Sequence, residues 1–281
     1  MTPEPNLHRS TVDGFGEEWS TFDQLALEEK EHEELFAEYF RIFPWRDLPD
    51  GACGADIGCG SGRWARLVAP RVGHLTCVDA SPAAIGVARR ALGAHENCTF
   101  AVASVDDLPF ADGSLDFAYS LGVLHHVPDT RAALRSCARV LKPGAPFLVY
   151  LYYALDGRPH WYRSLWKASD VLRRCVSRLP HPLKLAVSAV VAVAVYVPLA
   201  RAAKAMERLG RSAEGMPLTY YRNRSFYTMR TDAYDRLCTQ LEQRFTRKEI
   251  ERMLAEAGFV DVQFSDSAPF WCAVGRRAVR I

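Results

Sequence analysis

A glycine-rich segment near residue 58, followed along the chain by an aspartate, constrains the fold more than any other feature. The segment reads Gly54-Ala-Asp-Ile-Gly-Cys-Gly-Ser-Gly62, and the aspartate ends the apolar run Leu75-Thr-Cys-Val-Asp79. This order predicts a strand, a glycine turn, a helix and a second strand that ends in an acid. Such a unit holds a nucleoside against the carboxyl edge of a parallel sheet.

The spacing of the glycines excludes a dinucleotide. A dinucleotide turn reads G-x-G-x-x-G and places a diphosphate at a helix N-terminus. Here Gly58, Gly60 and Gly62 are each two residues apart, and the preceding Asp56 would repel a diphosphate. A nicotinamide-dependent reductase is therefore excluded. We expect this turn, with Cys59, to contact the ligand, and Asp56 to orient an ammonium group.

Asp79 lies where a carboxylate can accept hydrogen bonds from both hydroxyls of a ribose. A ribose and a cationic, amino-acid-like end without phosphates are features of S-adenosylmethionine. We therefore predict S-adenosylmethionine as the cofactor, with S-adenosylhomocysteine as its product.

From about Ala52 to Leu151 the chain resembles a class I S-adenosylmethionine-dependent methyltransferase. It is similar to the broad group that includes the ubiquinone/menaquinone C-methyltransferases and many small-molecule methyltransferases. Five motifs occur in the family's order, and they are Asp56-Ile-Gly-Cys-Gly-Ser-Gly62, Val78-Asp79-Ala-Ser81, Asp107-Leu-Pro-Phe110, the segment 116–129 and Leu141-Lys-Pro-Gly144. The resemblance implies the fold, the cofactor and methyl transfer, and it says little about the acceptor.

The resemblance also assigns contacts to the adenine and methionine parts of the cofactor. The family often has an acid four residues before the Leu-Pro-Phe turn, and this chain has Ser104 there. A serine hydroxyl accepts a hydrogen bond without charge assistance. Val105 would offer its backbone amide, and Asp106 or Asp107 is the alternative in a shifted register. The other expected cofactor contacts are Ala80, Ser120 and Leu121.

The acceptor side is less constrained by the sequence. His125 and His126 follow the fourth expected strand, and either is a candidate base for an acceptor that must lose a proton. The periodicity of one sequence does not decide which of the two faces the site. The candidate substrate contacts are Tyr152, Tyr153, Tyr221 and Arg224. No metal site is expected.

Strands that alternate with helices predict a doubly wound, mostly parallel α/β sheet of the Rossmann-like type. Seven strands are expected, at about 53–57, 75–79, 98–103, 115–120, 146–152, 259–265 and 270–275, the last two as an antiparallel edge. Helices are expected at about 62–69, 82–93 and 130–141, with a charged helix over 25–41 and a polar, mobile start over 1–24. Thr246 and Glu249 predict a capping box that begins a helix ending near Glu256.

Four parts follow from this pattern. Residues 1–50 are expected to form an N-terminal helical cap, 51–153 the cofactor-binding core, 154–244 a helical lid that binds the acceptor, and 245–281 a helix and strand hairpin that complete the core.

The lid segment contains an uncharged stretch, residues 185–200, between Lys184 and Arg201. Its 16 residues fall short of the ~20 that usually span a bilayer. A buried lid helix or a homodimer contact is one interpretation, a membrane-surface contact is another, and a true membrane span is the third. Several arginines and lysines flank the stretch and favour the surface interpretation.

Composition narrows the choice of partner and location. The formal charge is only +2, which argues against nucleic acid. The eight cysteines include no C-x-x-C pair, and the first residues, Met1–Pro5, lack an apolar signal region. We expect a cytoplasmic enzyme, with membrane association as an open alternative, that methylates a small or medium, apolar or lipid-linked molecule. The alternative function is a cofactor-binding scaffold without transferase activity.

Overall fold

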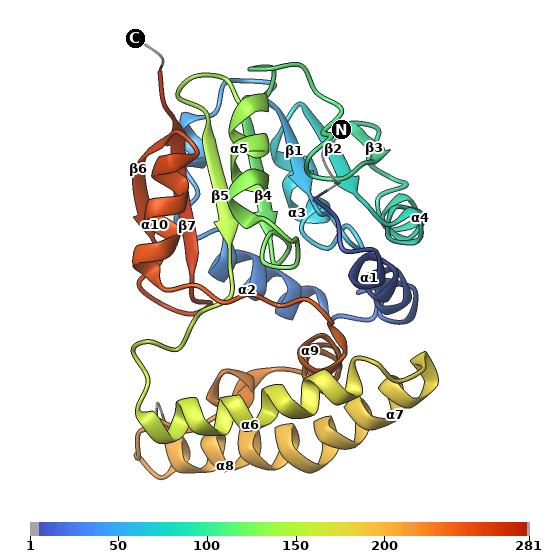
Figure 1. Ribbon diagram of the computed structural model, residues 1–281, viewed down its shortest axis with the longest axis vertical. Helices are drawn as coiled ribbons and strands as arrows, with labels where there is room; N and C mark the ends of the chain where they lie inside the picture. Colours follow the sequence, from blue (N-terminus) through green and yellow to red (C-terminus); the bar gives the residue numbers. More distant parts are fainter. Residues whose placement is uncertain (1–5, 214, 280–281) are drawn as a thin grey trace. The chain divides into compact units, whose positions relative to one another are not determined.

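The computed structural model describes residues 6–213 and 215–279 of the chain, which form two compact units (Figure 1). The sheet unit contains residues 6–25, 33–156 and 241–279 of the described chain. The helical unit contains Ala26–His32 and Gly157–Gln240. Residues Met1–Pro5, on which the expectation of no signal peptide depends, lie outside the described residues.

A seven-stranded sheet forms the centre of the sheet unit, in the order β3-β2-β1-β4-β5-β7-β6. The first five strands pair in parallel, and β7 runs antiparallel to both β5 and β6. The strand order reverses between β1 and β4, which is where ligands bind in open α/β sheets. The strands are β1 (Cys53–Ile57), β2 (His74–Asp79), β3 (Cys98–Val102), β4 (Phe117–Leu121), β5 (Pro146–Tyr150), β6 (Phe259–Phe264) and β7 (Cys272–Arg277). The expected fold class is confirmed.

The helices of the sheet unit flank this sheet, and α5 and α10 cover the same face of it (Figure 1). The helix after the glycine turn begins at Ala65 rather than at 62, because turns occupy the chain from 58 to 64. The helices are α1 (Arg9–Thr21), α3 (Ala65–Val68), α4 (Pro82–Ala91), α5 (Thr130–Val140) and α10 (Arg247–Glu256). A further helix, α2 (Glu29–Tyr39), begins among residues of the helical unit and ends among those of the sheet unit.

The core lies along the central strands, whose residues are apolar on both sides because helices cover both faces. All five residues of β4 are buried, including Phe117 and Tyr119. Phe147 of β5 stacks on Phe259 of β6, with ring centroids 5.2 Å apart. Burying each large apolar side chain contributes about 1.5–3 kcal/mol, so this layer holds the strand ends, and the loops that follow them, in place.

Local signals in the C-terminal part are confirmed. The Thr246 hydroxyl accepts a hydrogen bond from the Glu249 amide at 3.2 Å, and the Glu249 carboxylate accepts one from the Thr246 amide at 2.7 Å. This capping box satisfies two amides at the start of α10 that lack helical partners. The helix ends at Glu256, as the sequence indicates.

The expectation of a polar, mobile start over residues 1–24 is wrong for the described part, since Arg9–Thr21 forms α1. Contacts far along the chain hold this helix. The Leu241 amide donates to the Thr11 hydroxyl at 3.3 Å. Asn6 exchanges two hydrogen bonds of 2.8 Å with the backbone of Asp129. These partners are more than 120 residues away, so a local pattern does not reveal them.

In the helical unit, α6 (His160–Val176) and α7 (His181–Val191) contact α9 (Phe226–Cys238). A π-helical turn at Ala192–Tyr196 joins α7 to α8 (Val197–Arg208). The result is one helix of 28 residues, His181–Arg208, which is longer than the apolar stretch 185–200 suggests. Its length and composition would allow it to cross a membrane, although a core helix of a soluble protein can pass the same test.

Candidate active site

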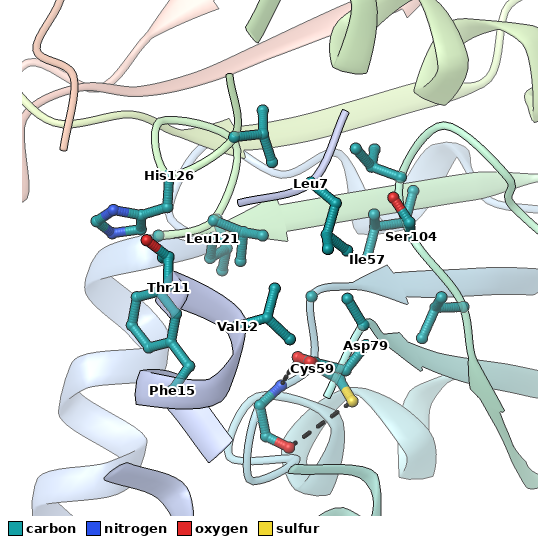
Figure 2. A pocket seen from close by; sticks show the side chains of 18 of the residues that line it. Leu7, Thr11, Val12, Phe15, Ile57, Cys59, Asp79, Ser104, Leu121 and His126 are labelled. Carbon is teal, nitrogen blue, oxygen red and sulfur yellow. Dashed lines mark hydrogen bonds between the residues drawn. The ribbon is translucent and has the colours of Figure 1, made fainter. Parts of the chain in front are cut away.

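A pocket opens at the carboxyl ends of the parallel strands in the sheet unit (Figure 2). Its walls come from the glycine turn after β1, the end of β2, the loops after β3 and β4, and helix α1. Segments widely separated in the sequence therefore meet at the switch point between β1 and β4.

The glycine turn is fixed by its backbone. The amides of Gly58 and Cys59 both donate to the Val78 carbonyl, at 2.7 and 2.9 Å, and so tie the turn to the end of β2. Gly58 has a φ of +81°, and a Cβ at this position would lie 2.4 Å from a methyl carbon of Val123. Only glycine combines this backbone conformation with such a close approach. Gly58, Cys59 and Gly60 line the pocket.

Asp79 ends β2 and lines the pocket beside this turn (Figure 2). One carboxylate oxygen accepts from the Gly60 amide at 3.0 Å, and the other from the Ser81 amide at 2.8 Å. Burial raises the pKa of Asp79, and these two hydrogen bonds oppose that shift. A carboxylate has about four acceptor positions, so the side chain can accept two further hydrogen bonds.

The residues after β3 form the wall beyond Asp79. Ala80, Ser104 and Val105 line the pocket, whereas Asp106 is exposed and does not. The Ser104 hydroxyl donates to the Asp106 carboxylate, which also accepts from the Asn6 amide at 3.0 Å. Asp106, an alternative adenine contact suggested by the sequence, therefore contacts Ser104 directly and fixes the orientation of the Ser104 hydroxyl.

The two adjacent histidines occupy different environments. His126 lines the pocket, and its Nδ1 lies 2.7 Å from the Leu241 carbonyl oxygen. Because a carbonyl can only accept, Nδ1 carries the proton in the neutral ring, and Nε2 is the nitrogen able to accept one. His126, Thr11 and Phe15 gather at one end of the pocket (Figure 2), with the Phe15 ring 5.0 Å from the imidazole.

His125 lies outside the pocket lining and is completely buried. Its ring packs on Tyr152 with centroids 3.8 Å apart, and neither ring nitrogen has a hydrogen-bond partner. Burial, together with the neighbouring His126 and Arg244, lowers the pKa of His125 well below its ordinary value. The neutral ring acts as a packing element beneath the loop that presents His126.

Asp56 is buried in β1 behind the glycine turn and does not line the pocket. The Tyr119 hydroxyl donates to its carboxylate at 3.0 Å. Burial raises the pKa of Asp56 to about 8, and the nearby Asp79 charge adds to the rise, while Tyr119 and Arg63 oppose it. Near neutral pH the folded protein therefore holds a proton on this side chain that the unfolded chain releases.

We expect replacement of Asp56 by asparagine to flatten the pH dependence of stability. In the parent chain, stability falls as pH rises from about 4 to about 8, because the unfolded state loses the Asp56 proton first. The variant lacks this loss, so its free energy of unfolding should rise relative to the parent's by at most about 1.4 kcal/mol per pH unit. Its thermal midpoint should rise relative to the parent's over the same pH range. A constant difference between the two midpoints from pH 5 to pH 8 would contradict the raised pKa.

Six other expected site residues are not among the lining residues of the pocket, and they are Gly62, Ser120, Tyr152, Tyr153, Tyr221 and Arg224. Gly62 packs toward α4, where a Cβ would lie 3.0 Å from Leu92. The buried Ser120 hydroxyl donates to the Ile57 carbonyl at 2.8 Å, and Leu121, the next residue, does line the pocket. Tyr153 packs against Trp271 in the sheet unit. Tyr221, which donates to Asp232 at 2.8 Å, and Arg224, which lies over Tyr220, belong to the helical unit.

Helix α1 supplies pocket residues that motif matching does not find. Thr11, Phe15 and Trp19 recur every four residues and so form one face of the helix, which lines the pocket. A Cβ at Gly60 would lie 2.8 Å from the Trp19 indole, so this ring covers the turn. In the sequence, only the four-residue spacing of these side chains indicated a shared helical face, because α1 has few other features typical of a helix. Leu7, Val12, Arg63, Trp64 and Val127 also line the pocket.

The pocket fits a nucleoside with an amino-acid tail. Asp79 offers acceptor oxygens for a diol, and the walls at Ala80 and Val105 are apolar enough for a base. Among the described residues that line the pocket, two carry a side chain of the lysine, arginine, aspartate or glutamate type, and they are Arg63 and Asp79. A single arginine suits one carboxylate, whereas a diphosphate beside Asp79 would be repelled.

Comparison with known proteins agrees with this geometry. The family model described as a methyltransferase domain matches residues 55–149. A ubiquinone biosynthesis O-methyltransferase of Xanthomonas oryzae pv. oryzae is 32% identical over 136 residues, which cover 48% of this chain and 56% of the relative. The chain thus spans about half the length of this curated relative.

Two solved structures share the fold. A SAM-dependent methyltransferase of Methanosarcina mazei matches with a TM-score of 0.52 and 18% identity, over 85% of this chain and 99% of that one. A protein of Bacillus halodurans C-125, named as a candidate methyltransferase, matches with a TM-score of 0.52 and 13% identity. The match covers 87% of this chain and 99% of that one. At these identities the likeness concerns the fold alone. The family match and the curated relative identify residues 55–149 as a methyltransferase domain, and the two solved structures show its fold.

Proposed function

We propose that this protein transfers a methyl group from S-adenosylmethionine to a small or medium-sized, apolar or lipid-linked acceptor. The observation that carries the proposal is the Asp79 carboxylate, which two backbone amides hold at the pocket wall beside the glycine turn. The similarity to proteins named as ubiquinone biosynthesis O-methyltransferases supports an apolar acceptor and transfer to oxygen.

Residues of the pocket would hold the cofactor by its separate parts. Asp79 would accept from the ribose hydroxyls, and Ala80, Ser104 and Val105 would contact the adenine. Arg63 would pair with the carboxylate of the methionine part. The buried Asp56, which holds a proton near neutral pH, would act on the ammonium group from behind the turn through a bridging water.

S-adenosylmethionine supplies a methyl group on a positively charged sulfur, a leaving group that departs neutral. The protein therefore has mainly to align the acceptor and to exclude water. The aromatic rings of Phe15 and Trp19 in α1 line the pocket with apolar surface and would help to exclude water. His126 would take the acceptor's proton on Nε2, while its Nδ1–H stays bonded to the Leu241 carbonyl.

We expect replacement of His126 by asparagine to slow transfer to a hydroxylated acceptor on the order of 100-fold at neutral pH. The amide of asparagine can still donate to the Leu241 carbonyl, but it cannot accept a proton. Cofactor affinity should change little, and the rate should recover at alkaline pH as the acceptor ionises by itself. Single-turnover rates measured across pH, with the affinity for S-adenosylhomocysteine, check both parts.

Replacement of His125 by asparagine provides the comparison. This buried ring lies outside the pocket lining, so its loss should lower stability more than the rate. A variant at His126 with the parent rate, together with a slow variant at His125, would contradict the assignment of the base.

Acceptor recognition is the less constrained part of the proposal. We assign it to the segment 154–244, expected to act as a closing lid, with Tyr152, Tyr153, Tyr221 and Arg224 as candidate contacts. A cytoplasmic location with membrane association, and a homodimer formed through 185–200, also remain predictions.

The test is transfer of a labelled methyl group from S-adenosylmethionine to a panel of apolar hydroxylated and aminated compounds, with a lipid extract included. The proposal predicts label in at least one extractable product, and its absence when Asp79 is replaced by asparagine. Tight binding of S-adenosylhomocysteine without transfer to any acceptor would favour the scaffold alternative.

A further inference from the structure

Over its first half, the long helix His181–Arg208 buries polar side chains and exposes apolar ones, the reverse of a surface helix in a soluble protein. The side chains that it buries include Lys184 and Ser188. Those that it exposes include Leu183, Val190 and Val193, with 51%, 65% and 58% of their surface accessible. A surface helix of a soluble protein places apolar residues inward and polar residues outward.

Helix α6 shows the same reversal. Asp170 and Arg173 are buried, whereas Trp161, Leu165 and Leu172 are 55%, 53% and 46% exposed. The exposed residues recur at intervals of four and seven, so they lie along one face. Two consecutive helices therefore present apolar stripes to the outside.

Specific interactions hold α6 in this orientation. The Arg173 guanidinium pairs with Asp170 at 2.7 Å and donates to the carbonyls of Thr239 and Gln240, at 2.7 and 3.0 Å. Turning α6 to bury its apolar face would break this network and leave a charged group without partners, which costs several kcal/mol. The outward apolar stripe is therefore a fixed feature of the helical unit.

The charge of this region identifies what covers the stripes. Residues 160–211 contain ten lysines or arginines and two acids, a formal charge of +8 in a chain whose total is +2. The exposed cations include Lys167, Arg174, Arg178, Arg201, Lys204 and Arg208. Apolar faces bordered by cations match the surface of an anionic bilayer, where acyl chains lie beneath negative headgroups. A second copy would instead bring two strongly positive surfaces together.

The packing of the long helix argues against a membrane span. Its inner side packs on α9 through Ala192, Ala200 and Ala233. Helix α9 carries Asp232 and Asp235, which would enter the hydrocarbon together with it. An orientation in the plane of the interface places only the exposed valine and leucine side chains among the acyl chains.

We propose that the outward faces of α6 and of the long helix form a binding surface for anionic membranes. The inference rests on the helical unit alone, and it gives the proposed methyl transfer a route to lipid-linked acceptors. The surface works without cofactor, so membrane binding is measurable even if no methyl transfer occurs.

The experiment is co-sedimentation of the full chain with vesicles of phosphatidylcholine alone or mixed with phosphatidylglycerol. We expect at least about tenfold tighter binding to the anionic vesicles, weakened by added salt. Val190→Glu and Leu165→Glu should each lower that affinity about tenfold or more. Val279→Glu, at an exposed valine of the sheet unit, should leave it unchanged. Replacing Arg201 and Lys204 by glutamine should lower the affinity for the anionic vesicles about fivefold for each charge removed.

Three results would overturn the proposal. Equal binding to both kinds of vesicle would remove the role of the cations. Unchanged binding by Val190→Glu and Leu165→Glu, with the variants still folded by circular dichroism, would remove the role of the stripes. A parent dimer that Val190→Glu converts to a monomer in solution, without vesicle binding by the parent, would assign the face to a second copy.

Discussion

Replacing Asp79 by asparagine is expected to lower the affinity for S-adenosylhomocysteine by at least about 100-fold. The carboxylate would accept from both ribose hydroxyls, and each charge-assisted hydrogen bond contributes roughly 1.5–3 kcal/mol. Losing both corresponds to about two or more powers of ten in the dissociation constant. Asparagine also turns a donor toward the amide of Gly60 or Ser81, which further disfavours the bound geometry. Titration calorimetry measures the change directly.

Two further variants separate this effect from a loss of folding. Asp107→Asn makes the same substitution at an exposed acid outside the pocket lining, and it should bind like the parent. Asp79→Glu keeps the carboxylate on a longer side chain and should retain part of the affinity. An Asp79→Asn variant that binds as tightly as the parent would remove the ribose contact from the account.

Replacing Gly58 by alanine should destabilise the sheet unit and abolish cofactor binding together. A left-handed backbone costs alanine about 1–2 kcal/mol, and overpacking against Val123 costs about 1–3 kcal/mol more. The β-branched Val123 has little rotamer freedom to give way, so the loop after β4 must move. Val123 lines the pocket, and its displacement changes the shape of the site. Chemical denaturation should show a loss of about 2–5 kcal/mol.

Gly86→Ala is the matched control for this change. Gly86 lies within α4, and a Cβ there would meet only an Arg90 nitrogen at 3.9 Å. The same substitution should therefore stabilise the protein by about 0.5–1 kcal/mol, because alanine favours a helix interior. If both alanine substitutions changed the free energy of unfolding equally, the backbone conformation of Gly58 would not require glycine.

The cofactor side of the site could be predicted from the sequence because its determinants are local. The glycine turn and Asp79 occupy two short motifs whose backbone positions follow from the strand–turn–helix order. The start of α10 was equally accessible, since a capping box involves residues only three apart. In each case the interacting atoms lie within one element or at the ends of adjacent parallel strands.

Helix α1 could not be predicted in the same way. Its sequence contains two glycines and several β-branched residues, and its N-cap His8 makes no capping hydrogen bond through its side chain. Propensity therefore favours no helix. Tertiary contacts of Thr11 and Asn6 with distant segments stabilise it instead. For the same reason, the sequence did not predict that Thr11 and Val12 of α1 line the pocket.

Side-chain direction was the second limit. The sequence presents His125 and His126 as equivalent neighbours, and the difference arises from packing on Tyr152 and from the Leu241 carbonyl. The same limit applies to the uncharged stretch 185–200, because composition alone does not reveal which face of this helix packs on α9. That Lys184 and Ser188 are buried while Val190 and Val193 are exposed became visible only in the three-dimensional structure.

The most direct test of the account is calorimetric titration of the purified protein with S-adenosylhomocysteine, with NADH as the control ligand. We expect binding of S-adenosylhomocysteine at micromolar concentration and no binding of NADH, because Asp79 is placed for a ribose and would repel a diphosphate beside it. Binding of NADH, or of neither ligand by a folded protein, would contradict the assignment of the pocket to S-adenosylmethionine.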